Sequence, residues 1–216
     1  MRKAILLDVF GTLVRDDGAG AAAIAAEVAA RAHVTAAEVT REWEARLWAM
    51  ADTAYGEGFR TLADLNAGSL AAAAAHFGVR VDAPVLCRAA QDPAPALFPD
   101  ARPFLDAVDV PVCLVSDADR DHLDGILRAL GITVDHVVTS EDARAYKPRP
   151  EPFQMALRLL GVAPADVVHI GVSPASDLLG AARLGIPAIF VNRTGRDLPD
   201  GLHPVRTVPS LALLPS

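Results

Sequence analysis

The chain has 216 residues, of which 52% are hydrophobic and 22% are charged, and it carries a formal net charge of −7. This length allows one large domain or a core domain with a smaller insert, and the composition excludes a disordered chain. The negative charge argues against nucleic acid or an anionic membrane as the main partner.

The sequence also lacks signals for membrane insertion, secretion and zinc binding. No segment approaches the roughly 18 apolar residues of a membrane span, and the apolar run after the basic start is too short for a signal peptide. Cys87 and Cys113 form no CxxC pair, and no His/Cys cluster suggests zinc. We therefore expect a cytoplasmic protein, monomeric or homodimeric, that acts on a small-molecule substrate and binds neither nucleic acid nor membrane.

The first strand is predicted within residues 3–12, which read KAILLDVFGT. The unbroken apolar run at residues 4–7 is typical of a strand buried on both faces of a parallel sheet. Asp8 follows it directly, at the strand end where open α/β sheets bind ligands. Gly11 allows a sharp turn, and Thr12 brings a hydroxyl close to the same point. Asp8 could instead simply cap a following helix.

A helical insert is predicted after this strand. No strand-like run interrupts it, and Thr35 with Glu38 forms the signature of a capping box. The expected helices lie at residues 21–32, 35–55 and 61–77, followed by a proline-rich stretch with one more short helix and a hinge. The sequence thus predicts a core domain at residues 1–16 and 97–216 and a helical cap domain at residues 17–96.

In the rest of the chain, strands and helices alternate. The expected strands lie at residues 110–115, 134–139, 167–171 and 188–192, with a possible edge strand at 205–208. The expected helices lie at residues 101–108, 119–130, 152–160 and 176–184. Repeated β-α units with short links predict a Rossmann-like α/β core with a doubly wound parallel sheet and right-handed crossovers.

Polar side chains follow four of the predicted strands, including the first strand at residues 4–7. They are Asp8, Ser116 with Asp117, Ser140 with Glu141, and Ser173 with Asp177 a turn later. Lys147 lies in a loop stiffened by prolines. Because the carboxyl ends of parallel strands share one edge of a sheet, we expect these groups to face one crevice. A solvated rim would show the same polarity, but agreement among four strand ends favours a functional site.

The ordered motifs resemble those of the haloacid dehalogenase superfamily. They are Asp8 in DVFGTL, Ser116 after an apolar strand, Lys147 in YKPRPEPF and Asp177 in GVSPASDLLGAARLGIP. Their order and spacing match that family across residues 3–193, and the helical insert sits where such proteins carry a cap. The resemblance implies a hydrolase in which Asp8 is the nucleophile of a covalent intermediate, Ser116 binds the leaving or transferred group, and Lys147 steadies the charge on Asp8.

Two positions depart from the phosphatase branch of that family. Phosphatases carry a second aspartate, which is a general acid and base, two residues after the nucleophile, where this chain has Phe10. They also hold Mg²⁺ with an aspartate directly after the fourth strand's glycine, where this chain has Val172, a side chain that cannot coordinate a hard cation. Asp8 and Asp177 would remain as ligands if Mg²⁺ is bound.

These departures favour the dehalogenase branch, in which a carboxylate displaces halide from carbon. Halide leaves without protonation, so the reaction needs neither a general acid nor a metal, and no cofactor is required. Dehalogenases of the family have an aromatic residue at the position of Phe10, and Arg41 of the cap could be their carboxylate- or halide-facing arginine, or else a solvated helix residue. The predicted substrate-binding residues are Phe10, Thr12, Arg41 and Asp117.

Other features keep alternatives open. Dehalogenases usually have asparagine after the motif serine, and Asp117 would repel halide if it were ionised. The sequence around Asp177 is closer to the phosphatase branch. A Mg²⁺-assisted phosphatase with a depleted site and a catalytically retired binding protein are therefore the alternative hypotheses. His169, inside a predicted buried strand, is expected to be a satisfied core histidine.

Overall fold

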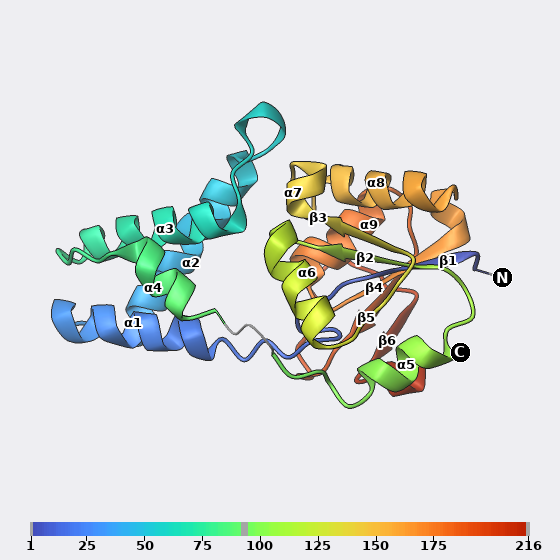
Figure 1. The fold of residues 1–216 in the computed structure, drawn as a ribbon, viewed down its shortest axis with the longest axis horizontal. Coiled ribbons are helices and arrows are strands. Elements are labelled where there is room, and N and C mark those ends of the chain that lie inside the picture. Colours follow the sequence, from blue (N-terminus) through green and yellow to red (C-terminus); the bar gives the residue numbers. More distant parts are fainter. Residues whose placement is uncertain (1, 92–94, 215–216) are drawn as a thin grey trace. The chain divides into compact units, whose positions relative to one another are not determined.

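The computed structural model describes residues 2–91 and 95–214 and contains two compact units (Figure 1). One unit comprises Met1–Asp16 and Ala94–Ser216, and the other comprises Asp17–Pro93. The predicted hinge after the cap falls partly on residues 92–94, which lie outside the described residues. None of the described helices is long and apolar enough to cross a membrane.

The first unit is built on a six-stranded parallel sheet, which confirms the predicted α/β class. The strands are β1 (Ala4–Leu7), β2 (Val112–Ser116), β3 (His136–Thr139), β4 (Val167–Gly171), β5 (Ala188–Val191) and β6 (Arg206–Val208). Their order across the sheet is β3-β2-β1-β4-β5-β6, with the predicted edge strand as β6. The chain winds outward from β1 in one direction and then in the other, so a topological switch point lies between β1 and β4.

Helices cover both faces of this sheet. They are α5 (Ala101–Ala107), α6 (Arg120–Ala129), α7 (Ser140–Ala143), α8 (Pro150–Leu160) and α9 (Leu179–Arg183). Alternate residues of β1 enter two separate hydrophobic cores, in which Ile5 belongs with Phe104 of α5, and Leu6 with Phe153 of α8. β1 is therefore buried on both faces, as its apolar run predicts, and it carries Asp8 at its carboxyl end to the switch point.

The second unit is helical throughout its described regular structure. Its α-helices are α1 (Ala19–Ala32), α2 (Ala36–Thr53), α3 (Leu62–His76) and α4 (Ala83–Ala89). The predicted capping box opens α2: the Thr35 hydroxyl accepts from the N–H of Glu38 at 3.2 Å, and the Glu38 carboxylate accepts from the N–H of Thr35 at 2.8 Å. The unit has its own core, which includes Val28, Trp43 and Leu70.

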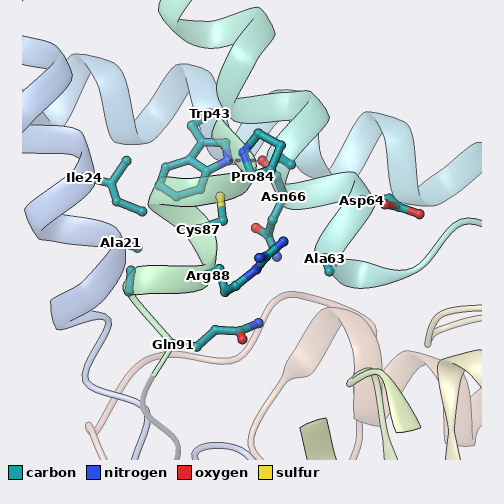
Figure 2. Close-up of a pocket in the computed structure, with 12 residues that line it drawn as sticks. Ala21, Ile24, Trp43, Ala63, Asp64, Asn66, Pro84, Cys87, Arg88 and Gln91 are labelled. Atoms are coloured by element: carbon teal, nitrogen blue, oxygen red, sulfur yellow. Dashed lines mark hydrogen bonds between the residues drawn. The ribbon is translucent and has the colours of Figure 1, made fainter. Parts of the chain in front are cut away.

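A cavity of about 320 Å³ lies among the helices of this second unit (Figure 2). Trp43 forms part of its wall and donates its indole N–H to the Ser69 hydroxyl at 3.0 Å. Cys87 and Arg88 of α4 also line it, and burial raises the pKa of the Cys87 thiol. None of the predicted site residues lines this cavity.

Candidate active site

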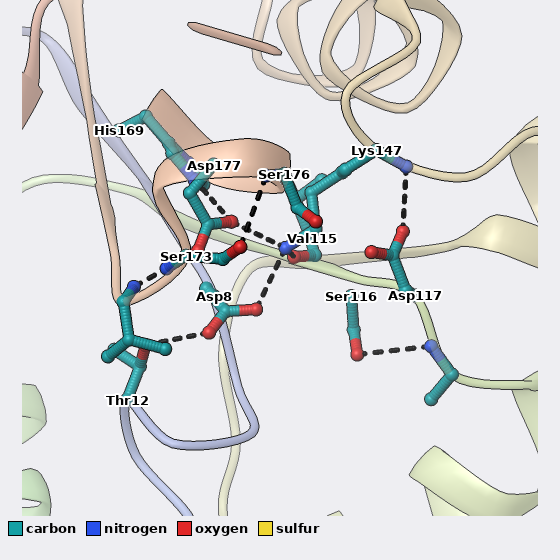
Figure 3. Close-up of polar contacts among 12 residues, drawn as sticks. Asp8, Thr12, Val115, Ser116, Asp117, Lys147, His169, Ser173, Ser176 and Asp177 are labelled. Atoms are coloured by element: carbon teal, nitrogen blue, oxygen red, sulfur yellow. Dashed lines mark hydrogen bonds and ion pairs between the residues drawn. The ribbon is translucent and has the colours of Figure 1, made fainter. Parts of the chain in front are cut away.

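A buried lysine joins two carboxylates at the switch point of the sheet (Figure 3). The Nζ of Lys147 donates to Oδ1 of Asp8 at 2.8 Å, to Oδ1 of Asp177 at 2.6 Å and to the carbonyl oxygen of Val115 at 3.1 Å. The side chains of Lys147, Asp8 and Asp177 are 3%, 9% and 1% exposed. The ammonium therefore uses all its protons within a cluster that is almost shielded from water.

The turn after β1 orients the carboxylate of Asp8. The Thr12 hydroxyl donates to Oδ2 of Asp8 at 2.6 Å, while Lys147 occupies Oδ1. Thr12 can reach back because the chain turns at Gly11, whose φ of +78° favours glycine. A Cβ at Gly11 would also lie 3.0 Å from Cγ2 of Val172. Each oxygen of Asp8 thus accepts one of these two bonds, which fixes the plane of the carboxylate.

An irregular helix start turns Asp177 into the site. The sequence predicts a regular helix over residues 176–184, but a π-helical turn (Pro174–Leu178) precedes α9, so this boundary is wrong. Oδ2 of Asp177 accepts from the backbone N–H groups of Val172 and Ser173 at 3.0 and 2.9 Å. Such turns are frequent at functional sites, because they redirect a side chain without ending the helix.

His169 completes the hydrogen bonding of Asp177. It is fully buried in β4, and its Nε2 lies 3.0 Å from Oδ1 of Asp177. Because Lys147 keeps that carboxylate ionised, Nε2 carries the proton and donates it. Within the described part of the chain Nδ1 has no hydrogen-bond partner. The prediction of a satisfied core histidine is therefore right for one nitrogen only, and nothing in the sequence links His169 to the site.

The ion cluster shifts the pKa values of the two carboxylates in opposite directions. Burial, together with the negative charge of Asp177, raises the pKa of Asp8 above its ordinary value, although Lys147 and Thr12 stabilise its charged form. Burial acts on Asp177 in the same direction, but the charge of Lys147 and the bond from His169 hold the pKa of Asp177 well below its usual range. Asp8 is thus the more basic carboxylate, which suits a nucleophile.

Ser116 and Asp117 follow β2 at the same edge of the sheet. Ser116 is 1% exposed, and its hydroxyl accepts from the N–H of Ala118 at 3.3 Å. Oδ1 of Asp117 accepts from the backbone N–H of Lys147 at 2.8 Å. Burial raises the pKa of Asp117 to about 6, and the neighbouring carboxylates add to this effect. Asp117 therefore changes its charge close to neutral pH.

The remaining two predicted residues lie in different units. Phe10 is partly buried and stacks on His122, with ring centroids 6.1 Å apart and an interplanar angle of 3°. Its ring therefore fills space beside the turn after β1, where an aspartate would offer oxygen. Arg41 is an exposed residue of α2 in the second unit, and its contact with a substrate stays a prediction.

Mg²⁺ requires near-octahedral ligation by oxygen atoms, and the side chains at this edge of the sheet offer few free ones. Val172 offers only a hydrocarbon side chain directly after β4. Asp177 already accepts four hydrogen bonds, two on each oxygen, from the groups described above. Across residues 2–91 and 95–214, no group of three or more His, Cys, Asp or Glu side chains is placed to hold a metal ion. The residues present therefore do not fit Mg²⁺.

Comparisons with known proteins identify the family of the chain. Residues 2–185 match the model of the haloacid dehalogenase-like hydrolases. The chain is 40% identical over 106 residues to haloacid dehalogenase-like hydrolase domain-containing protein 3 of Danio rerio, covering 48% of this chain and 43% of that protein. It is 32% identical over 103 residues to (S)-2-haloacid dehalogenase 4A of Burkholderia cepacia, covering 45% and 44%. It is 33% identical over 104 residues to phosphoserine phosphatase of Thermus thermophilus, covering 45% and 41%.

A solved structure shares the fold over nearly the whole chain. It is an L-2-haloacid dehalogenase of Xanthobacter autotrophicus with chloropropionic acid covalently bound, with a TM-score of 0.78, 20% identity and coverage of 98% of this chain and 96% of that one. By contrast, the chain spans less than half the length of the curated relatives above.

The sheet, its helical insert and the carboxylate–lysine cluster at the switch point define an α/β enzyme core. Since the family model covers most of the chain, the protein belongs to the haloacid dehalogenase-like hydrolases.

Proposed function

We propose that this hydrolase displaces halide from a small 2-haloalkanoate, with Asp8 as the nucleophile and without a metal ion. The observation that carries the proposal is the buried ion cluster, in which Asp8 and Asp177 share the ammonium of Lys147 at 2.8 and 2.6 Å. The ammonium of Lys147 thus offsets one of the two negative charges from within the protein. The similarity to (S)-2-haloacid dehalogenase 4A adds support from the comparisons.

The proposed reaction has two steps. A carboxylate oxygen of Asp8 forms a bond to the substrate Cα, and halide leaves with the electron pair of the carbon–halogen bond. Water then adds to Cγ of the resulting Asp8 ester, the 2-hydroxy acid leaves, and one proton is released. Holding the carboxylate in a fixed plane between Lys147 and Thr12 favours in-line attack on one atom, which is worth several orders of magnitude in rate.

The absence of an oxygen ligand at Val172 and of a carboxylate at Phe10 suits this chemistry better than phosphoryl transfer. Transfer of a phosphoryl group depends on metal ions, which neutralise the developing charge, and on a proton donor for the leaving alkoxide. Halide needs no proton. Ser116, Asp117, Phe10 and Arg41 are proposed to contact the substrate or the departing halide.

A Mg²⁺-assisted phosphatase is the second candidate, favoured by the similarity to phosphoserine phosphatase. It would have to bind its cation with Asp8 and Asp177 alone among the predicted ligands. A protein that binds a ligand without turnover is the third. Both candidates keep the fold. In the phosphatase, Asp8 would also hold the cation and the substrate would be a phosphate ester, whereas in the binding protein Asp8 would form no bond to the ligand.

The decisive experiment is a single turnover in H₂¹⁸O with excess enzyme, 2-chloropropionate and EDTA. Attack by Asp8 predicts an unlabelled first product, because its hydroxyl oxygen comes from the carboxylate, and ¹⁸O in the peptide that contains Asp8. Label in the first product would mean direct attack by water and would overturn the assignment.

The D8N variant serves as the control, and its fold is checked by circular dichroism. Loss of halide release in a folded D8N protein supports the proposal. Failure of the wild-type enzyme to release halide from any member of a 2-haloacid panel contradicts it, and phosphate release that requires Mg²⁺ would favour the second candidate.

A further inference from the structure

Arg193, just beyond β5, contacts the turn that carries the nucleophile. Its Nε donates to the carbonyl oxygen of Gly11 at 3.2 Å, and its Nη2 donates to that of Thr12 at 2.7 Å. The side chain is only 15% exposed, and its guanidinium lies 3.8 Å above the centre of the Phe98 ring. One side chain thus holds two consecutive carbonyl groups from a segment far away in the sequence.

A second carboxylate holds Arg193 in this position. Both oxygens of Asp100 accept from the guanidinium at 2.9 Å, in a bidentate pair. Asp100 also accepts from the Ser210 hydroxyl at 2.5 Å and from the N–H of Leu211 at 2.8 Å. Although burial opposes it, these bonds lower the pKa of Asp100, so the pair stays charged. The C-terminal segment is thereby connected to the turn after β1.

The same turn places the Thr12 hydroxyl against Asp8. Its backbone is closed by hydrogen bonds from the N–H groups of residues 12–14 to the carbonyl oxygen of Val9. The carbonyls of Gly11 and Thr12 point away from these bonds and toward Arg193. Without the guanidinium they would lose their charged donor, and the turn would be free to shift.

We propose that Arg193 is a positioning residue that holds the Gly11 and Thr12 carbonyls, so that the Thr12 hydroxyl keeps the Asp8 carboxylate in its reactive orientation, and that Asp100 with residues 210–211 holds Arg193 in place. The catalytic part of this inference rests on the proposed role of Asp8. The conformational part, that Arg193 orders residues 11–14, does not. A guanidinium suits the task because its planar fork makes four hydrogen bonds here, to two carbonyls and to both oxygens of a carboxylate, whereas an ammonium has only three N–H donors.

The test compares R193A and R193K with R102A. Arg102 is a matched control, because it also donates to two consecutive carbonyl groups, those of Leu130 and Gly131 at 2.6 and 3.1 Å, away from the site. Hydrogen exchange followed by mass spectrometry should rise about tenfold in residues 11–14 of R193A, less in R193K and not in R102A, because local opening there becomes easier. Unchanged exchange in both Arg193 variants would overturn the proposal, whatever the enzyme acts on.

Kinetics test the catalytic part. In R193A, kcat on 2-haloacids should fall on the order of 10- to 100-fold at nearly constant KM, as expected for a misplaced nucleophile. The T12V variant should lose rate as well, and adding R193A to T12V should cost much less than it does in the wild type. Additive effects would show that Arg193 does not act through Thr12. If R193A fails to fold, R193K and D100N provide the same comparison.

Discussion

Gly171 lies so close to Asp177 that a Cβ on Gly171 would stand 2.4 Å from Cγ of Asp177. The last residue of β4 must therefore lack a side chain for the π-helical turn to bring the Asp177 carboxylate to Lys147. The position of Asp177 in the ion cluster thus depends on a glycine at residue 171.

The G171A variant should accordingly lose activity and stability. Asp177 is held by four hydrogen bonds and cannot move aside freely, so we expect a destabilisation of about 1–3 kcal/mol from overpacking, measured by urea denaturation. G125A is the control, since a Cβ at Gly125 in α6 meets nothing within 4 Å. It should be neutral or stabilise the protein by up to about 1 kcal/mol. Equal effects of the two variants would contradict the packing argument.

Replacing Lys147 should be far more damaging than replacing an exposed lysine. In K147M, Asp8 and Asp177 would face each other without a cation, which should cost about 3–5 kcal/mol of unfolding free energy. K3M removes an ion pair to Asp166 of similar length, 3.0 Å, but on a lysine that is 64% exposed. Its cost should be about 0–1 kcal/mol. A small effect of K147M in chemical denaturation would mean that the buried charges are compensated in another way.

Asp117 should make substrate binding depend on pH. Its pKa of about 6 means that it is neutral below that pH and ionised above it. If the substrate is an anion that approaches Asp117, KM should rise as the pH increases through about 6, while D117N should show a flat KM over the same range. The measurement is a pH series of kcat and KM with EDTA present. A pH dependence of KM that survives in D117N would assign it to another group.

The same residue should also affect stability. Since the folded-state pKa of Asp117 is raised, its contribution to folding is present below pH 4 and is lost as the pH rises through about 6. Asparagine stays neutral and can still accept from the N–H of Lys147. The gain in unfolding free energy of D117N over the wild type should therefore be larger at pH 8 than at pH 4, by on the order of 1–3 kcal/mol. An equal effect at both pH values would show that the raised pKa is absent.

Adding the missing carboxylate should create affinity for Mg²⁺. V172D places an acidic oxygen ligand directly after β4, beside the edge that carries Asp8 and Asp177, whereas V172N adds only a weaker neutral ligand. Isothermal titration with Mg²⁺ should give measurable binding for V172D, weaker binding for V172N and none for the wild type. Wild-type binding as tight as that of V172D would favour the phosphatase alternative.

The parallel sheet, and the edge at which its polar groups meet, could be predicted from the amino-acid pattern. Unbroken apolar runs such as residues 4–7 can be buried on both faces only between two helical layers, and parallel strands bring their carboxyl ends together. Asp8, Lys147 and Asp177 could therefore be grouped from their order along the chain alone. The capping box at Thr35 was equally predictable, because its bonds join neighbouring residues.

The hydrogen-bond partners of the buried polar groups could not be predicted in this way, because they depend on the folded arrangement. The bond of His169 to Asp177 depends on a π-helical turn, and the contacts of Arg193 with Gly11 and Thr12 join segments that no local pattern relates. Local rules describe residues a few positions apart, whereas hydrogen bonds between distant segments depend on how side chains pack once the sheet has formed. The pairing of Lys147 with Asp8 and Asp177 is likewise a contact between distant segments, and burial, the charge of Asp177 and the charge of Lys147 together shift the pKa of Asp8.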